Sequence, residues 1–121
     1  MTKNVDVKKF ESNGEVFEIG SYHEISILIR KSDGYINATK LCSQFESKSG
    51  ENKRFRNIIQ TQTWQEFYEA YFDEFQENSG SAVFPADLIY MLKHKFSNDA
   101  QGQYIHPKLI NTLILLVRIK R

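Results

Sequence analysis

Three cations, Lys53, Arg54 and Arg56, stand close together, and Asn57 follows them directly. Ammonium and guanidinium groups neutralise phosphates, and an arginine can make two parallel hydrogen bonds to the edge of a guanine. On a helix, the apolar residues between these cations turn inward, which leaves the charges on the exposed side. The pattern predicts a helix that contacts nucleic acid. A solvated basic face that binds nothing has the same pattern, so both interpretations stay open.

Further cations flank this group in the sequence. Lys48 precedes the predicted helix and Lys40 lies on the helix before it; each is expected either to hold a backbone phosphate or to be an ordinary surface lysine. A second cluster, Lys93, His94 and Lys95, is placed at the end of another predicted helix, where the helix dipole also stabilises cations. The candidate DNA-binding residues are therefore Lys40, Lys48, Lys53, Arg54, Arg56, Asn57, Lys93 and Lys95.

Charge is distributed unevenly along the chain. The net charge of +1 does not by itself indicate a nucleic-acid-binding protein. Bases outnumber acids over residues 40–60 and again from residue 93 onward, whereas residues 64–78 hold five acids and no base. This segregation predicts one basic face and one acidic face, and it makes a phosphate-bearing partner plausible for the first of them.

Length and composition exclude several classes. A chain of 121 residues fits one domain. Its longest apolar run, Leu113–Val117, is far shorter than a bilayer span, and Met1–Phe10 lacks the apolar core of a signal peptide. Cys42 is the single cysteine, so we expect neither an intrachain disulfide nor a cysteine-built zinc site. An intracellular location follows as the expectation.

Catalysis is not expected. His106 is a candidate general base, but no serine, cysteine or carboxylate stands at a spacing that would form a triad with it, and we expect it to fix the step into the last helix. Cys42 falls on the apolar stripe of its helix. The histidines His23, His94 and His106 are far apart and show no zinc-ligand spacing. We therefore expect no enzyme activity, no cofactor, no metal and no small-molecule substrate.

The N-terminal half predicts strands followed by a capped helix. Alternating apolar residues predict strands at Glu15–Gly20 and Ile25–Arg30, joined by turn chemistry at 31–34 to a brief strand at 35–36. Asn37 is a strong N-cap for a short helix that ends near Phe45.

The C-terminal half predicts mainly helices. We expect helices from Lys53 to about Gln60, from 64 to 76 with Thr63 as its cap, from 88 to about 96, and from Pro107 onward. The loop 97–103 and a short extended piece at 104–105 precede the last of them. The aromatic stripe of the helix at 64–76 is expected to be core, with binding of a partner or a second copy as the alternative.

Three motifs in this order resemble one family. DGYINATKLC at residues 33–42, KRFRNI at 53–58 and GQYIHPKLI at 102–110 are similar to motifs of the KilA-N domain of large DNA viruses and phages, which is itself similar to the DNA-binding domain of fungal APSES transcription factors. The first and third motifs are specific, whereas the second is weak by itself. The resemblance covers about residues 25–110.

The resemblance implies a small α+β domain. We expect it to span residues 1–121, with 1–14 as a flexible lead-in, and we expect no RING domain, because a single cysteine could not build the one that poxvirus members of the family carry. The resemblance also implies short β-hairpins and several helices around a winged helix-turn-helix-like core, in which the helix near Lys53 is the recognition helix. The implied partner is double-stranded DNA, with RNA and a homodimer left open. A viral regulatory or host-interaction role in the host cytoplasm or nucleus would follow. The alternative is a protein-interaction module that uses the acidic aromatic helix 64–77.

Overall fold

The computed structural model describes residues 8–22, 24–45, 54–80 and 87–118. In this part of the chain, strands form one antiparallel six-stranded sheet in the order β1-β2-β3-β4-β6-β5. The strands are β1 (Lys8–Ser12), β2 (Glu15–Tyr22), β3 (Ile25–Arg30), β4 (Ile36–Asn37), β5 (Ile89–Leu92) and β6 (Gly102–Ile105).

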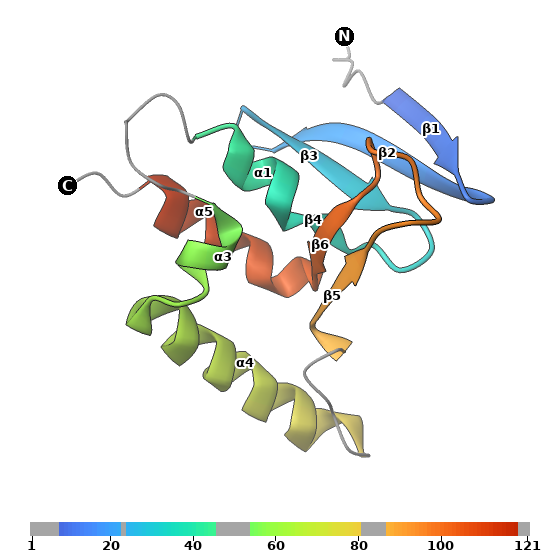
Figure 1. The fold of residues 1–121 in the computed structure, drawn as a ribbon. Helices are drawn as coiled ribbons and strands as arrows, with labels where there is room; N and C mark the ends of the chain where they lie inside the picture. Colours follow the sequence, from blue (N-terminus) through green and yellow to red (C-terminus); the bar gives the residue numbers. More distant parts are fainter. Residues whose placement is uncertain (1–7, 23, 46–53, 81–86, 119–121) are drawn as a thin grey trace, which may run out of the picture.

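The helices of the described residues are α1 (Ala38–Ser43), α3 (Phe55–Ile58), α4 (Gln62–Ser79) and α5 (Ile110–Arg118), and a short 3-10 helix, η2 (Pro107–Leu109), leads into α5. Helix α3 packs against α1 and α5, while the long helix α4 lies below them along the outside of the molecule (Figure 1). The predicted α+β class is confirmed. The winged helix-turn-helix core stays a prediction.

The sheet carries a core on each of its faces. Isoleucines of β3, β4 and β6 face the helices, where they pack with buried residues that include Leu41, Phe55, Trp64, Leu109 and Leu113. On the other face lies a smaller core of Phe17, Leu28, Leu92, Ala100 and Tyr104. Because successive side chains of a strand point to opposite faces, Tyr104 and Ile105 serve different cores.

The first hairpin joins β1 to β2 through Asn13 and Gly14. Both residues have a positive φ, 54° and 77°, and Ser12 pairs directly with Glu15. Asn-Gly favours this two-residue turn because it tolerates a positive φ at both positions. The strand Lys8–Ser12 therefore lies inside the segment for which the sequence predicted only a flexible lead-in.

The turn predicted at residues 31–34 is confirmed. Gly34 has a φ of 77°, and its N–H donates to the carbonyl of Arg30 at 2.7 Å. The carboxylate of Asp33 accepts a hydrogen bond from the backbone N–H of Tyr35 at 3.0 Å. The chain thus returns as β4, which pairs Ile36 with Ile29 of β3.

The helix predicted from 88 to about 96 is wrong. Residues Ile89–Leu92 form β5, which pairs with β6 from Ile89↔Ile105 to Leu92↔Gly102. A short run of apolar residues fits a buried strand or a helix equally well, and here the pairing with β6, further along the chain, decides for the strand.

The cap predicted for the long helix is also wrong, because it falls further along the chain than the observed one. Thr61, not Thr63, is the N-cap of α4, and its hydroxyl accepts a hydrogen bond from the N–H of Trp64 at 3.2 Å. The hydroxyl oxygen can reach the free amide three residues ahead, which is the usual capping geometry. None of the helices in the described segments combines the length with the hydropathy that a membrane-spanning helix requires.

Candidate nucleic-acid interface

The predicted recognition helix is a single turn, α3. Its apolar residues Phe55 and Ile58 are 3% and 6% exposed, and the Phe55 ring meets Trp64 edge-on with centroids 5.7 Å apart. These two anchors turn Arg56 outward. Arg54 stands at the N-cap in an extended conformation and is also exposed, whereas Asn57 is half-buried. Lys48 and Lys53 lie outside the described residues.

Helix α1 lies beside α3 and carries Lys40. The predicted cap is confirmed, because the side-chain oxygen of Asn37 accepts a hydrogen bond from the N–H of Lys40 at 2.9 Å. The hydroxyl of Thr39 accepts a hydrogen bond from the N–H of Gln103 at 3.0 Å and so ties α1 to β6.

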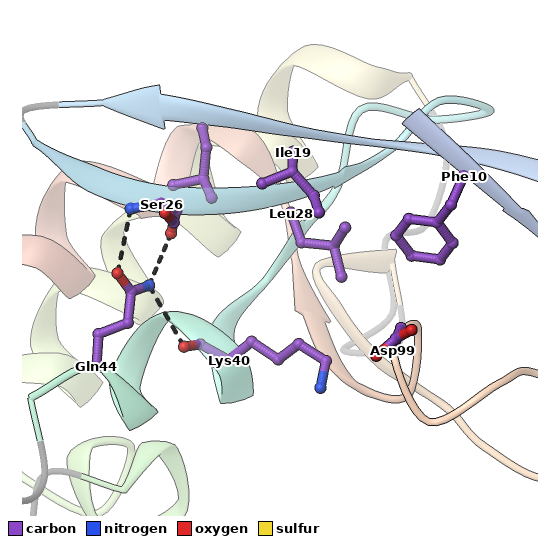
Figure 2. A pocket seen from close by; sticks show the side chains of 8 residues that line it. Phe10, Ile19, Ser26, Leu28, Lys40, Gln44 and Asp99 are labelled. Atoms are coloured by element: carbon purple, nitrogen blue, oxygen red, sulfur yellow. Dashed lines mark hydrogen bonds between the residues drawn. The ribbon is translucent and has the colours of Figure 1, made fainter. Parts of the chain in front are cut away.

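The end of α1 is fastened to the sheet by Gln44. Its carboxamide oxygen accepts from the N–H of Ser26 at 3.1 Å, and its nitrogen donates to the carbonyl of the same residue at 2.7 Å (Figure 2). One side chain thereby satisfies both backbone groups of a β3 residue, as a neighbouring strand would. This contact fixes the exit of α1 toward the segment that leads to α3.

An open pocket of about 510 Å³ lies between α1 and the second face of the sheet. Figure 2 shows apolar side chains of β1, β2 and β3 on one side and the side chain of Lys40 extending toward Asp99 on the other. Its lining residues are Phe10, Ile19, Ser26, Ile27, Leu28, Lys40, Gln44 and Asp99.

The second basic cluster does not join the first. Lys93, His94 and Lys95 are exposed and follow β5 directly, and His94 has a φ of 45°. Since no helix ends there, the interpretation through a helix dipole is wrong. The same connection continues to Ser97, whose N–H donates to the hydroxyl of Ser12 at 2.8 Å. The cluster therefore lies on a connection that reaches β1, whereas α3 packs against α1 and α5.

The motif at residues 33–42 is held in a network centred on Arg30. Its guanidinium makes two hydrogen bonds to the carboxylate of Glu15, at 2.6 and 2.7 Å, and a third to the hydroxyl of Tyr90 at 2.9 Å. The Tyr90 hydroxyl donates in turn to Asp33. These bonds from Arg30 hold the pKa of Glu15 below its ordinary value, while burial raises the pKa of Tyr90. The aspartate of the motif is therefore a structural residue.

His106 fixes the step into the last helix, as predicted. Its Nδ1 accepts a hydrogen bond from the N–H of Lys108 at 3.1 Å, which caps η2. The ring lies between Tyr35 and Phe75, with centroids 5.3 and 4.6 Å away. Burial, followed by the nearby charge of Lys108, lowers the pKa of His106. The neutral imidazole is thus the form that the fold favours.

The acidic helix α4 is largely exposed. Its acids, Glu66, Glu69, Asp73, Glu74 and Glu77, all face solvent. Of its aromatic stripe only Trp64 is fully buried, several others are half-buried against the core, and Phe67 is 43% exposed. The expectation of a core stripe holds for one side of the helix. The rest forms an acidic, partly aromatic surface.

Sequence reasoning identified the cations but missed the pocket at Lys40. No contiguous signal marks this pocket, because its walls come from three strands, α1 and the 93–101 connection. Cys42 is fully buried, in line with the prediction that it is a core residue. Within the described part of the chain, no histidine, cysteine and carboxylate side chains form a group that would hold a metal ion.

A family model described as the KilA-N domain matches residues 20–117. This range includes the capped helix α1, the cations of α3 and the β5–β6 hairpin. The chain belongs to the KilA-N domain family, whose members generally bind nucleic acid.

The relatives come from one virus. Three putative KilA-N domain-containing proteins of Acanthamoeba polyphaga mimivirus are 29%, 28% and 25% identical to this chain, over 89%, 94% and 86% of its length. The chain spans only 28%, 44% and 25% of these relatives. No solved structure gives a significant match.

Proposed function

We propose that this domain binds double-stranded DNA through the exposed cations of α3, Arg54 and Arg56, with Asn57 beside them. The observation that carries the proposal is the burial of Phe55 and Ile58, at 3% and 6% exposure, because it directs Arg56 to solvent on a turn anchored in the core. Lys48 and Lys53, which precede this turn in the sequence, would add charge to the same interface. Membership of the KilA-N family supports nucleic acid as the partner.

Lys40, Lys93 and Lys95 would contact the same nucleic acid further along. Helix α1, which carries Lys40, contacts both α3 and β6, and Lys40 shares a pocket with Asp99 of the connection that also carries Lys93 and Lys95. A DNA strand that passes α3 and continues across α1 would meet first the cations of α3, then Lys40, and then Lys93 and Lys95. Contacts from lysines to phosphates position a protein on DNA without reading its sequence.

The proposal describes a binding domain without catalysis. His106 and Cys42, the two side chains considered for catalysis, have structural roles, since His106 caps η2 and Cys42 is buried in the core. The relatives in a large DNA virus favour a viral regulatory role.

A second candidate function is the recruitment of a protein through α4. The exposed acids and the 43% exposure of Phe67 favour it, because such a face repels phosphates and offers apolar contact area. A mass that rises with protein concentration, in the absence of any DNA affinity at low salt, would favour this function over DNA binding.

The test of the main proposal is a charge reversal. In the double variant Arg54→Glu/Arg56→Glu, affinity for a labelled random duplex should fall at least about tenfold at low salt, because two cations become two anions at the interface. The matched control is Lys8→Glu/Lys9→Glu on the edge strand β1, where Lys8 and Lys9 are exposed. It makes the same change in net charge away from α3 and should lower the affinity much less.

Circular dichroism checks that both variants keep their fold. An equal loss of affinity in the two variants would mean that only net charge matters and that α3 is not the interface. An affinity untouched by the reversal on α3 would contradict the proposal outright.

A further inference from the structure

Lys40 contributes its backbone N–H to the cap of α1, but its side chain, unlike that of Asp33, has no structural role in the 33–42 motif. Asp33, Tyr35 and Asn37 are hydrogen-bonded, Thr39 ties α1 to β6, and the apolar members are in the core. The ammonium of Lys40 has no hydrogen-bond or ion-pair partner in the described part of the chain. This ammonium group is therefore available to a ligand.

The carboxylate of Asp99 is a second charged group of this pocket without a polar contact in the segments that the structure describes. It lines the same pocket, opposite α1, and has no partner among the described residues. Figure 2 shows both side chains at one side of the pocket, facing the apolar side chains of Phe10, Ile19 and Leu28. The carboxamide of Gln44 and the backbone of Ser26 satisfy each other. Two opposite charges and an apolar wall are therefore what the pocket offers.

We propose that this pocket binds an unpaired nucleotide, with Lys40 on its phosphate, Asp99 on the donor edge of its base and Phe10 beneath its ring. This inference rests on the proposed nucleic-acid-binding function and adds an unpaired nucleotide to the phosphate contact proposed for Lys40. Phe10 stacks with one face on Phe17, at 5.3 Å between centroids, and its ring lines the pocket. Aromatic side chains bind unpaired bases in this manner.

The chemistry of a nucleotide matches each group in turn. Phosphate is the usual partner of a surface lysine in nucleic-acid complexes. A carboxylate accepts hydrogen bonds from the amino group of cytosine, which thymine lacks. A volume of about 510 Å³ lies in the range of small-molecule sites. A duplex does not fit this role, because its bases are stacked and paired.

The test uses a single-stranded oligonucleotide of deoxycytidine and, as a second probe, deoxycytidine 5′-monophosphate. We expect Lys40→Met, Asp99→Ala and Phe10→Leu each to weaken binding of the oligonucleotide about tenfold, since each removes one of the three contacts proposed for the nucleotide. Phe10→Leu keeps an apolar side chain at the pocket, so that the fold survives if Phe10→Ala does not. Matched controls are Lys8→Met on β1 and Asp73→Ala on α4, whose side chains are exposed and outside the pocket.

A base preference provides the second readout. The protein should bind oligodeoxycytidine more tightly than oligodeoxythymidine, and Asp99→Ala should abolish this difference. Binding of the monophosphate with a similar loss in the variants would identify a free nucleotide as the ligand. Binding of the oligonucleotide alone would identify a nucleotide within a strand. Either result supports the proposal.

The experiments test the nucleotide pocket and the duplex interface at α3 independently. If the three pocket variants keep wild-type affinity for both single-stranded probes, the pocket assignment is wrong, whatever α3 does. If Arg54→Glu/Arg56→Glu leaves duplex binding unchanged while the pocket variants lose the oligonucleotide, the duplex interface is wrong and the pocket stands.

Discussion

The side chain of Asn37 lies so close to Gly102 that any side chain at position 102 would force it to move. A β-carbon on Gly102 would stand 2.7 Å from the side-chain oxygen of Asn37, and the φ of Gly102 is 140°. Asn37 is fully buried, and besides capping α1 it donates to the carbonyl of Gln101 at 2.9 Å. The first and third sequence motifs therefore meet in one packing contact, which explains the residue type at both positions.

This contact predicts non-additive stability changes. Gly102→Ala should lower the free energy of unfolding by about 3 kcal/mol through the clash and the unfavourable φ. Asn37→Ala should lower it by about 2–4 kcal/mol, because it removes a cap and leaves the part-buried carbonyl of Gln101 without its donor. The loss of stability in the double variant should be smaller than the sum of the two single losses by at least about 1 kcal/mol, since removing the carboxamide of Asn37 relieves the clash. Urea unfolding measures all three, and strict additivity would show that the two residues do not press on each other.

The Gln44–Ser26 contact predicts a specific cost for a near-isosteric change. Gln44→Met keeps the approximate size of the side chain but removes both the oxygen that accepts from the N–H of Ser26 and the nitrogen that donates to its carbonyl. We expect the free energy of unfolding to fall by about 1 kcal/mol and the amide of Ser26 to exchange its hydrogen faster. If that amide exchanges at the wild-type rate in the variant, Gln44 does not close the edge of β3.

The cap at His106 predicts a pH dependence. Because the pKa of His106 is lowered in the fold, the unfolded chain binds the proton first as the pH falls below the ordinary value of 6.5. The stability that neutral His106 contributes is therefore fully present above that pH and is lost as the pH falls through the lowered pKa. Protonation also removes the acceptor for the N–H of Lys108.

The variant His106→Asn provides the control, because asparagine caps a helix without titrating. Unfolding by urea at about one pH unit above and about one unit below the ordinary histidine pKa should show a larger loss of stability in the wild type than in the variant. Parallel losses in the two proteins would rule out His106 as the titrating group, since His23 and His94 are present in both.

The sequence predicted the elements whose signal is local. The turn at 31–34, the cap at Asn37 and the strands beginning at Glu15 and Ile25 depend on neighbouring residues, and all are present. Asn13-Gly14 carried an equally local hairpin signal that the prediction overlooked. The strand conformation of β5 could not be predicted from neighbouring residues, because it depends on pairing with β6.

The candidate site was predicted less completely than the fold. The exposed cations of α3 could be located because the apolar residues around them have helical spacing. The pocket at Lys40 brings together residues as far apart as Phe10 and Asp99, and a single sequence contains no signal for such a contact. The separation of Lys93 and Lys95 from α3 likewise depends on the tertiary path of the β5–β6 hairpin.

The central claim is that α3 contacts the phosphates of duplex DNA, and a salt titration tests it most directly. A labelled random duplex is titrated at low and near-physiological salt with the wild type and with Arg54→Gln/Arg56→Gln. The wild-type affinity should fall steeply with salt. When the logarithm of the binding constant is plotted against the logarithm of the salt concentration, the slope should be shallower in the variant by up to about 1.8. Each phosphate that a cation neutralises adds about 0.9 to this slope. No binding at low salt, or identical slopes for the two proteins, would contradict the claim.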